Sequence, residues 1–245
     1  MAALKTIKLA EYIPPAFTVK HHELKFDLQN NGEVLVNHVQ KIVRCQPSHD
    51  ENGWELPQDK HVVLHAEHLV LETIEIDGKA LETDLYDYDG SHLTLKNVTD
   101  TFNLRTVVRL KPDENKELSG LYRSNGIYCT QCEAEGFRRI SPTLDRPDVL
   151  ATYRVRIEAD KKNNPVLLSN GNRELQGDLP GGRHYVQWYD PHPKPSYLFA
   201  LVAGNLACVN RLITTSKGRK INLSIYTEPA FINQTSFAMQ SLIDS

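Results

Sequence analysis

Residues 131–139 contain the side chains of this sequence that are best suited to chemistry. The segment is polar, charged and irregular, it contains Gly136, and it lies between two halves that are rich in predicted strands. Loops on a rigid β scaffold commonly display the groups that bind ligands. The alternative is a set of solvated ion pairs of little energetic value, formed among Glu133, Glu135, Arg138 and Arg139. Composition alone does not decide between these two interpretations.

Two histidine patterns resemble metal sites but lack the required spacing. Residues 22–26 read HELKF and begin like the zinc motif H-E-x-x-H, in which two histidines one helical turn apart bind the metal. Phe26 replaces the second histidine, and the segment alternates like a strand. Residues three apart on a strand point to opposite faces, so His65 and His68 cannot share a site there. We expect exposed histidines on polar faces, and no metal site in this chain, for His61, His65 and His68.

Cys129 and Cys132 form a single C-x-x-C pair. Thioredoxin-like chemistry requires such a pair at a helix N-terminus, where the helix dipole lowers the thiol pKa, and no strand-helix-strand pattern surrounds this pair. A structural zinc site needs two further ligands, but Cys45 and Cys208 are isolated in the sequence. We expect reduced cysteines, with Cys129 and Cys132 as buried or half-buried free thiols.

The composition argues against nucleic acid and membranes as partners. The 245 residues carry a formal net charge of -3, from 28 basic and 31 acidic residues mixed along the chain, so no basic stripe follows a phosphate backbone. The longest apolar runs, such as residues 197–203, are far shorter than the roughly 20 residues that cross a bilayer. Residues 1–9 contain no apolar signal-peptide core. We therefore expect a cytoplasmic protein.

Alternation of apolar and polar residues predicts paired antiparallel strands along most of the chain. The clearest pair is 17–28 with 34–43, because Asn31 and Gly32 between them suit a tight hairpin turn. About a dozen short strands with almost no helical periodicity predict an all-β fold, a saddle-like antiparallel β-sandwich. The further predicted strands are 62–65, 69–76, 92–96, 104–110, 151–159, 166–169, 184–189, 197–203, 207–214 and 220–226.

The strand pattern ends near Pro229. Residues 237–243 place apolar side chains at helical spacing, and the chain stops at Ser245 without a C-cap. One interpretation is a terminal helix that docks on the domain. The other is a helix that opens a further domain of a longer protein.

Several motifs together resemble zinc aminopeptidases of the aminopeptidase N type from proteobacteria. The match is dense from about residue 120 to residue 204, and looser but colinear outside that range. Such a density of matches is far more specific than one short motif. The resemblance is carried by GLY at 120–122, CTQCEAEGFR at 129–138, LDRPDVL at 144–150, LLSNGN at 167–172, Trp188, DPHPKP at 190–195 and YLFALVAG at 197–204.

The resemblance implies a division of the chain at residue 205. Residues 1–205 would form the N-terminal saddle-shaped β domain, and residues 206–245 the truncated start of an α+β, thermolysin-like catalytic domain. In that family the catalytic domain carries a G-x-M-E-N motif and the H-E-x-x-H zinc motif, and neither occurs in these residues. We therefore expect zinc-dependent peptide hydrolysis from the intact protein. This chain alone is expected to be inactive, with no catalytic residue and no bound zinc, and to need the downstream catalytic domain as its partner.

The resemblance also assigns a role to Gln131 and Glu133. In the family, the β domain supplies a Gln-x-Glu loop to the active site, and these two residues match it. The free α-amino group of a peptide has a pKa of about 8 and is largely cationic at neutral pH. Glu133 can accept charge-assisted hydrogen bonds from this ammonium group, and Gln131 can add a neutral acceptor.

The implied function is therefore the removal of N-terminal residues from peptides during peptide catabolism. The sequence determines neither the preferred N-terminal residue nor the oligomeric state. The alternative function is a stand-alone, non-catalytic β-sandwich module that binds a protein partner.

Overall fold

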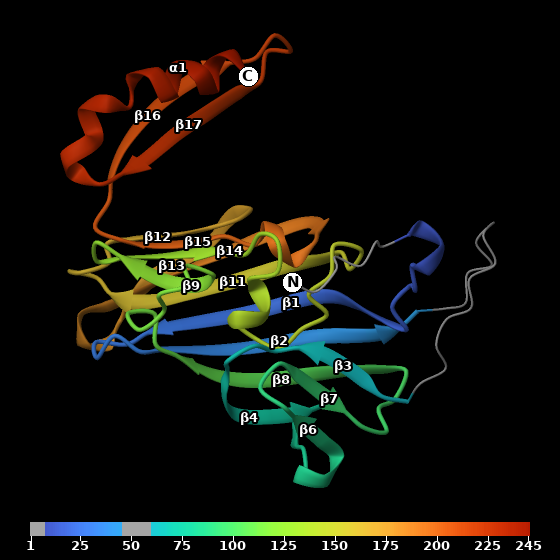
Figure 1. Ribbon diagram of the computed structural model, residues 1–245. Coiled ribbons are helices and arrows are strands. Elements are labelled where there is room, and N and C mark those ends of the chain that lie inside the picture. The colour runs from blue at the N-terminus through green and yellow to red at the C-terminus, as the bar shows by residue number, and fades with distance from the viewer. Residues whose placement is uncertain (1–7, 46–59) are drawn as a thin grey trace, which may run out of the picture.

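The computed structural model describes residues 8–45 and 60–245, most of which lie in β-strands (Figure 1). The helical elements are short, namely η1 (Leu9–Glu11), η2 (Thr83–Leu85), η3 (Phe137–Arg139), η4 (Pro180–Gly182), η5 (Ser196–Leu198), η6 (Pro229–Gln234) and α1 (Ser236–Asp244). The strands are β1 (Phe17–Leu28), β2 (Val34–Arg44), β3 (Val62–His65), β4 (Val70–Ile76), β5 (Lys79–Ala80), β6 (Tyr86–Tyr88), β7 (His92–Leu95), β8 (Thr101–Leu110), β9 (Gly120–Ser124), β10 (Ile127–Gln131), β11 (Ala151–Asp160), β12 (Val166–Ser169), β13 (Asn172–Leu179), β14 (Arg183–Lys194), β15 (Leu201–Gly204), β16 (Ala207–Thr214) and β17 (Lys220–Thr227).

The strands form one large sheet and three smaller ones. The large sheet has eight strands in the order β13-β14-β11-β1-β2-β8-β4-β5. A four-stranded sheet has the order β12-β15-β10-β9, a three-stranded sheet the order β3-β7-β6, and β16 pairs with β17. This architecture confirms the predicted all-β fold.

The central hairpin of β1 and β2 follows directly from the sequence pattern. Leu24 and Phe26 are buried and alternate with more exposed residues, because successive side chains on a strand point to opposite faces. The turn is closed by a hydrogen bond of 3.1 Å from the Gly32 main-chain nitrogen to the Gln29 oxygen. Gly32 has φ of +86°, whereas Asn31 does not enter the positive region that its type would tolerate.

One neighbouring pair of strands in the large sheet is parallel, unlike the antiparallel pairing that we predicted. β11 lies beside β1 with Leu24 opposite Val155 and Phe26 opposite Ile157. Parallel neighbours require a long connection. The chain between β1 and β11 provides it, since that stretch also builds strands β2 to β10. Alternation along a strand does not record the direction of its neighbour, so the sequence pattern could not reveal this pair.

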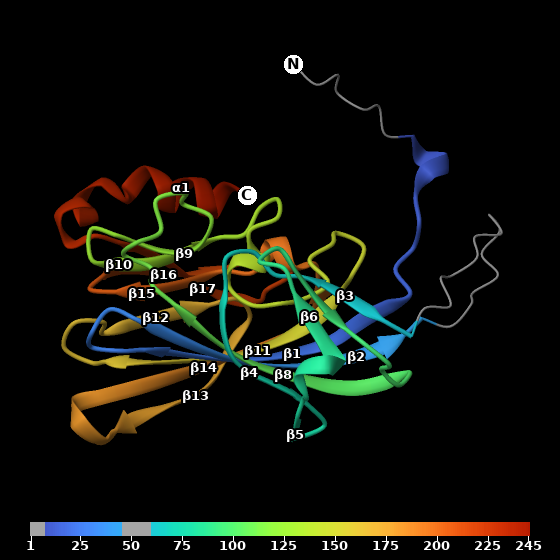
Figure 2. The ribbon, with the colours of Figure 1, turned by 60° about the horizontal axis from the view of Figure 1, so that its bottom comes forward.

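The smaller four-stranded and three-stranded sheets share one hydrophobic core with the large sheet (Figures 1 and 2). Phe26 of β1 stacks on Phe199 with ring centroids 5.8 Å apart, and Phe199 meets Phe137 edge-on at 5.2 Å. The other face of the large sheet is charged, as in the ion pair of 3.1 Å between Lys25 and Glu158. The molecule is thus a layered β structure in which the large sheet is apolar on its inner face and charged on its outer face.

Buried polar side chains attach residues 137–145 to the inner face of β1 and β2. The His22 Nδ1 and His38 Nε2 atoms are 2.8 Å apart, and the His38 Nδ1 atom lies 2.8 Å from the Ser141 hydroxyl. None of these side chains is more than 2% exposed. Buried polar groups are costly unless they are hydrogen-bonded, so this network specifies where the segment lies. His22 therefore lies on a strand, as the alternation predicted, and the structure shows that it is buried.

Residues 206–245 extend from the layered body as a hairpin followed by helical turns (Figure 1). Strands β16 and β17 pair with each other and with no other described strand. Pro229 starts η6, a position where its missing N–H group is tolerated. The helix predicted at 237–243 is confirmed as α1, which buries Met239 and leaves Phe237 exposed.

The sequence pattern misses five of the strands. β5, β6, β9 and β10 are among them and have five residues or fewer. β13 lies at the edge of the large sheet, is almost wholly exposed, and reads NRELQGDL, with few residue types that favour strands. Gln131, the first residue of the segment expected to be irregular, is therefore the last residue of a strand.

The longest helix in the described part of the chain, α1, has nine residues. No helix within residues 8–45 and 60–245 is long and apolar enough to cross a membrane. Residues 1–7, which make up most of the segment that lacks a signal-peptide pattern, lie outside the described residues.

The two buried histidines predict a loss of stability in mild acid. Burial lowers the pKa of His38 to about 3 and holds the pKa of His22 well below its usual value. Both histidines have a pKa of about 6.5 in the unfolded chain. Below that pH the unfolded chain binds protons that the folded protein cannot bind. The free energy of unfolding should therefore fall by about 1.4 kcal/mol per pH unit for each histidine, until the folded pKa is reached.

Urea unfolding between pH 7 and pH 5 measures this slope. His38→Gln should flatten the pH dependence, whereas His192→Gln, at an exposed position, should leave it unchanged. Equal slopes for the wild type and His38→Gln would show that His38 is not the source of the acid sensitivity.

Candidate functional site

Residues 132–136 form a loop that joins β10 to η3. Gln131, the last residue of β10, pairs with Gly120 of β9, which holds the start of the loop. Phe137, the first residue of η3, is fully buried in the core. The packed scaffold therefore holds both ends of the loop, which is the arrangement expected of a ligand-binding loop.

Gln131 and Glu133, the two residues predicted to bind substrate, both lie exposed at this loop. The Gln131 side-chain nitrogen donates a hydrogen bond of 3.0 Å to the main-chain oxygen of Glu133. The peptide bond from Glu133 to Ala134 is cis. Within residues 8–45 and 60–245, the Glu133 carboxylate forms no hydrogen bond or ion pair. The loop thus presents an unpaired carboxylate to the surface, a group that accepts hydrogen bonds from a cation.

The other charged residues of the segment form ion pairs, but only the pair of Arg138 with Glu135 lies within the segment, as the alternative interpretation predicted. Arg138 lies 3.0 Å from Asp145 and 3.3 Å from Glu135, and Arg139 lies 3.1 Å from Glu67. Arg138 is only 9% exposed, however, so its pair with Asp145 is buried rather than solvated. Removing one partner of a buried pair is strongly destabilising because it leaves a buried charge. The segment therefore contains ion-paired charges together with one carboxylate, that of Glu133, that forms no ion pair among the described residues.

Gly136 allows the loop to fold back closely on itself. Its main-chain nitrogen donates a hydrogen bond of 2.8 Å to the Cys132 oxygen. A Cβ atom at this position would lie 2.3 Å from the Gln131 oxygen and 2.9 Å from the Cys132 Cα atom. No side chain larger than hydrogen fits at Gly136 unless the loop moves.

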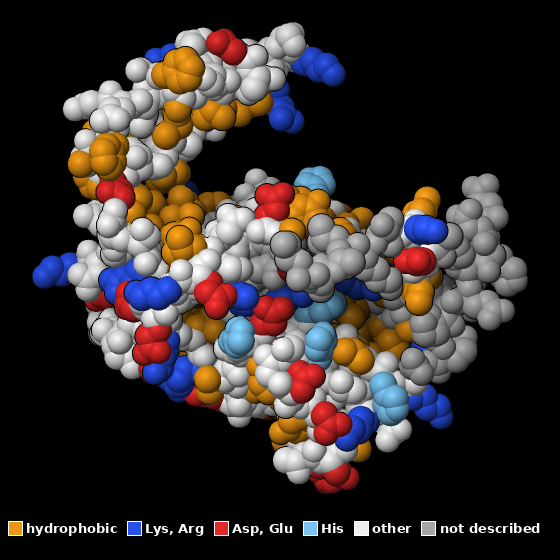
Figure 3. All heavy atoms as spheres, viewed as in Figure 1, with side chains coloured by type: hydrophobic (Ala, Val, Ile, Leu, Met, Phe, Trp, Pro, Cys, Tyr) orange, Lys and Arg blue, Asp and Glu red, His pale blue; other side chains and the backbone are white. Residues whose placement is uncertain are grey.

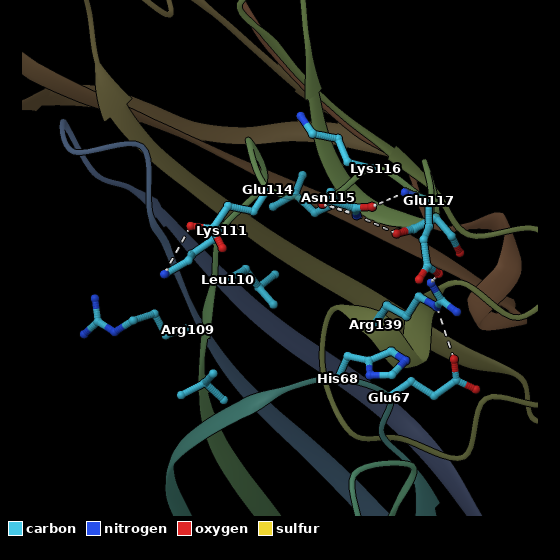
Figure 4. A pocket seen from close by; sticks show the side chains of 13 residues that line it. Glu67, His68, Arg109, Leu110, Lys111, Glu114, Asn115, Lys116, Glu117 and Arg139 are labelled. Carbon is cyan, nitrogen blue, oxygen red and sulfur yellow. Dashed lines mark hydrogen bonds and ion pairs between the residues drawn. The ribbon is translucent and has the colours of Figure 1, made fainter.

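A surface pocket of about 460 Å³ lies beside the loop (Figure 4). Arg139 lines it from the η3 side and pairs there with Glu67 and Glu117. On another wall, Lys111 lies 3.2 Å from Glu114. These charges neutralise one another. These ion pairs therefore leave little unpaired charge for a ligand on those walls of the pocket. No sequence pattern predicted this pocket, because its walls come from distant segments.

The histidines do not assemble into a metal centre. Among the described residues, no group of three or more His, Cys, Asp or Glu side chains could hold a metal ion. His61 and His68 are exposed as predicted. His65 is half-buried rather than exposed, because its Nδ1 atom accepts a hydrogen bond of 3.2 Å from the Asp145 main-chain nitrogen. The described residues therefore do not form a site that fits a zinc ion.

The cysteine prediction is confirmed. Cys129 is half-buried and Cys132 is buried, and both are free. Burial raises the pKa of both thiols, which disfavours the reactive thiolate. The C-x-x-C pair therefore helps to anchor the start of the loop, since Cys132 packs in the core.

Sequence reasoning missed two acidic residues that pair with the arginines of η3, Asp145 and Glu67. Asp145 falls in the run LDRPDVL that carries part of the resemblance, which was a signal that the position matters. Nothing in that run indicates that Asp145 binds Arg138. Glu67 is 72 residues from Arg139 in the chain, and no local pattern links positions so far apart.

Comparison with known proteins identifies a family model and several relatives that match this chain. The family described as the Peptidase M1 N-terminal domain matches residues 19–198. The chain is 43% identical to aminopeptidase N of Caulobacter vibrioides over 97% of its length, and 40% identical to aminopeptidase N of Escherichia coli over 96%. It spans 26% of the length of each of these relatives.

Solved structures agree with the sequence comparison. Legionella pneumophila aminopeptidase A, in complex with aspartic acid, matches 96% of this chain with a TM-score of 0.87 and 34% identity, over 27% of its own chain. An M1 zinc metallopeptidase from Deinococcus radiodurans, bound to a Tyr-Ser-Ala substrate, shares the fold over 87% of this chain and 48% of its own. Its TM-score is 0.69 at 15% identity.

The close approach at Gly136 predicts a destabilised variant. Gly136→Ala should lower the free energy of unfolding by about 1 to 3 kcal/mol, because the added methyl group overlaps the Gln131 oxygen and the loop must shift. Urea unfolding of this chain measures the change. Ala134→Ser, at an exposed position of the same loop, serves as control and should stay within about 0.5 kcal/mol of the wild type. An unchanged midpoint for Gly136→Ala would mean that the loop is not closed as described.

Proposed function

The chain belongs to the M1 peptidase family through its N-terminal domain, and from this premise we propose that it is the amino-terminal part of a zinc-dependent aminopeptidase. In this proposal the intact enzyme removes N-terminal residues from peptides in the cytoplasm. Gln131 and Glu133 recognise the free α-amino group of the substrate. The observation that carries the proposal is the unpaired, exposed carboxylate of Glu133 on a loop whose two ends are held by the core.

The chemistry of Glu133 suits the detection of a chain end. The α-ammonium group of a peptide is a cation that donates hydrogen bonds, and a carboxylate without an internal partner accepts them at full strength. Gln131 uses its amide nitrogen within the loop, which leaves its oxygen as a second acceptor. A peptide bound through an internal segment carries no such cation and would leave Glu133 buried and unpaired. This penalty favours exopeptidase over endopeptidase action.

A catalytic domain that continues from residue 206 is the proposed partner of this β domain. The hairpin of β16 and β17 pairs with no other described strand, and a two-stranded hairpin is marginally stable alone in water. Hydrophobic side chains gather on the C-terminal hairpin and helix and on the body surface facing them (Figure 3). Leu212 and Phe237 are more than half exposed. The relatives are about four times as long as this chain, which supports the remaining part of the same polypeptide as the occupant of these surfaces.

Zinc belongs to the proposed catalytic domain and not to these residues. The described residues contain no group that could bind the ion, so no step of the reaction is assigned to a metal held by this chain. The contribution of this chain is to bind and orient the amino end of the substrate.

Replacement of Glu133 tests the proposal in the enzyme that contains this chain together with the catalytic domain. Glu133→Ala should raise KM and lower kcat/KM by an amount equivalent to about 1.5 to 3 kcal/mol, because a charge-assisted hydrogen bond to the ammonium group is lost. Steady-state hydrolysis of aminoacyl anilides measures the effect. Glu174→Ala, on the exposed edge strand β13, is the control and should leave the kinetics unchanged. Unchanged kinetics for Glu133→Ala would rule out the assigned role.

The division of labour between the domains predicts an inactive short chain. After metal stripping and zinc re-addition, residues 1–245 should hydrolyse no aminoacyl anilide, whereas the polypeptide extended through a zinc motif should regain activity with zinc. Hydrolysis by the stripped short chain would contradict the proposal. A natural stop codon at residue 245 would favour the non-catalytic binding module instead.

A further inference from the structure

Asp145 lies beneath the loop and joins three separate segments of the chain. Its Oδ2 atom accepts hydrogen bonds from the Arg138 main-chain nitrogen at 3.2 Å and from the Arg138 Nε atom at 3.0 Å. Its Oδ1 atom accepts a hydrogen bond from the Ser196 hydroxyl of η5. Its main-chain nitrogen donates to His65 of β3 at 3.2 Å. At 4% exposure, Asp145 is a buried junction between η3, η5 and the three-stranded sheet.

Arg138 also contacts the loop, through Glu135. Its Nη2 atom donates to the Asp145 main-chain oxygen at 3.1 Å and lies 3.3 Å from the Glu135 carboxylate. Its Nη1 atom lies 3.6 Å from Glu67. The planar guanidinium therefore connects a carboxylate of the exposed loop to a carboxylate of the buried junction. A lysine cannot reproduce this geometry, since its ammonium group is a point charge without a fixed fork.

The two arginines that follow Glu133 are the nearest competitors for its carboxylate along the chain. Both are occupied elsewhere, because four carboxylates surround them. These carboxylates belong to Glu67, Glu117, Glu135 and Asp145. The surplus of negative charge leaves Glu133 without a cationic partner and favours the approach of an external cation.

We propose that Arg138 and Asp145 are positioning residues for Glu133. Their buried ion pair anchors the downstream end of the loop, and it keeps the Arg138 cation away from the carboxylate that receives the substrate. The upstream end is held separately by the pairing of Gln131 in β10. This inference rests on the proposed function of Glu133. It adds the ion pair that keeps Glu133 oriented and unpaired.

Kinetics of the enzyme that contains this chain and its catalytic domain provide the first test. Arg138→Lys keeps the charge but loses the fork, and should raise KM for an aminoacyl anilide roughly tenfold while changing kcat much less. Asp145→Asn should act in the same direction. Glu158→Gln is the matched control, because Glu158 is a carboxylate of similar burial that binds Arg156 and Lys25 on the opposite face of the large sheet. It should leave KM unchanged.

A double-mutant cycle separates positioning from general destabilisation. If Arg138 acts through Glu133, then Arg138→Lys should have almost no further effect on KM in the Glu133→Ala background. Full additivity of the two changes would overturn the inference, as would an unchanged KM for Arg138→Lys alone. If Asp145→Asn does not fold, the cycle of Arg138→Lys with Glu133→Ala still tests the inference.

Hydrogen exchange of residues 1–245 provides a readout that needs no activity. The Gly136 amide is bonded within the loop, so its exchange reports loop closure. Arg138→Lys should accelerate this exchange roughly tenfold, and Glu158→Gln should not. Equal exchange in the wild type and Arg138→Lys would overturn the inference. An unchanged KM for Glu133→Ala, with accelerated exchange in Arg138→Lys, would instead refute the proposed function and leave the anchoring role in place.

Discussion

The burial of residues 137–145 against β1 and β2 is the constraint on which the rest of the candidate site depends. Once this segment is inside, each of its polar groups must find a partner, because an unsatisfied buried group costs free energy. The His22, His38 and Ser141 side chains meet this requirement on one side, and Arg138 with Asp145 on the other. Few arrangements satisfy all of these bonds together. The segment therefore has a defined position, and it fixes the downstream end of the loop that precedes it.

The same packing sorts the charges of the loop into two groups. Arg138 binds the nearby Asp145 and Arg139 binds Glu67 from a distant part of the chain, while Glu133 stays exposed and unpaired. An exposed carboxylate so close in sequence to two arginines would ordinarily pair with one of them, with little gain in stability. Here the arginines are already bound to other carboxylates, so the Glu133 carboxylate remains accessible to an external cation. In the proposed function, that cation is the α-ammonium group of a peptide.

The β domain on its own can provide only part of such a site. It presents the exposed carboxylate of Glu133, but the described residues hold no metal-binding group, and the C-terminal hairpin has free edges and exposed apolar side chains. In the proposed enzyme, the partner that covers these side chains also brings the reacting groups to the loop. Folding of the two domains against each other and assembly of the complete active site would then be the same event, driven mainly by apolar burial.

The sequence by itself determined the all-β class, the central hairpin, the terminal helix, the family and the absence of a complete zinc motif. Each of these depends on local alternation, on turn residues or on contiguous motifs. It pointed to Gln131 and Glu133 only through resemblance. The parallel pairing of β1 with β11, the burial of Arg138 and its junction at Asp145 were decided by the tertiary structure. These features join residues that are distant in the chain or unrelated by any period. Their energies come from burial and from shared partners, neither of which exists before the chain has folded.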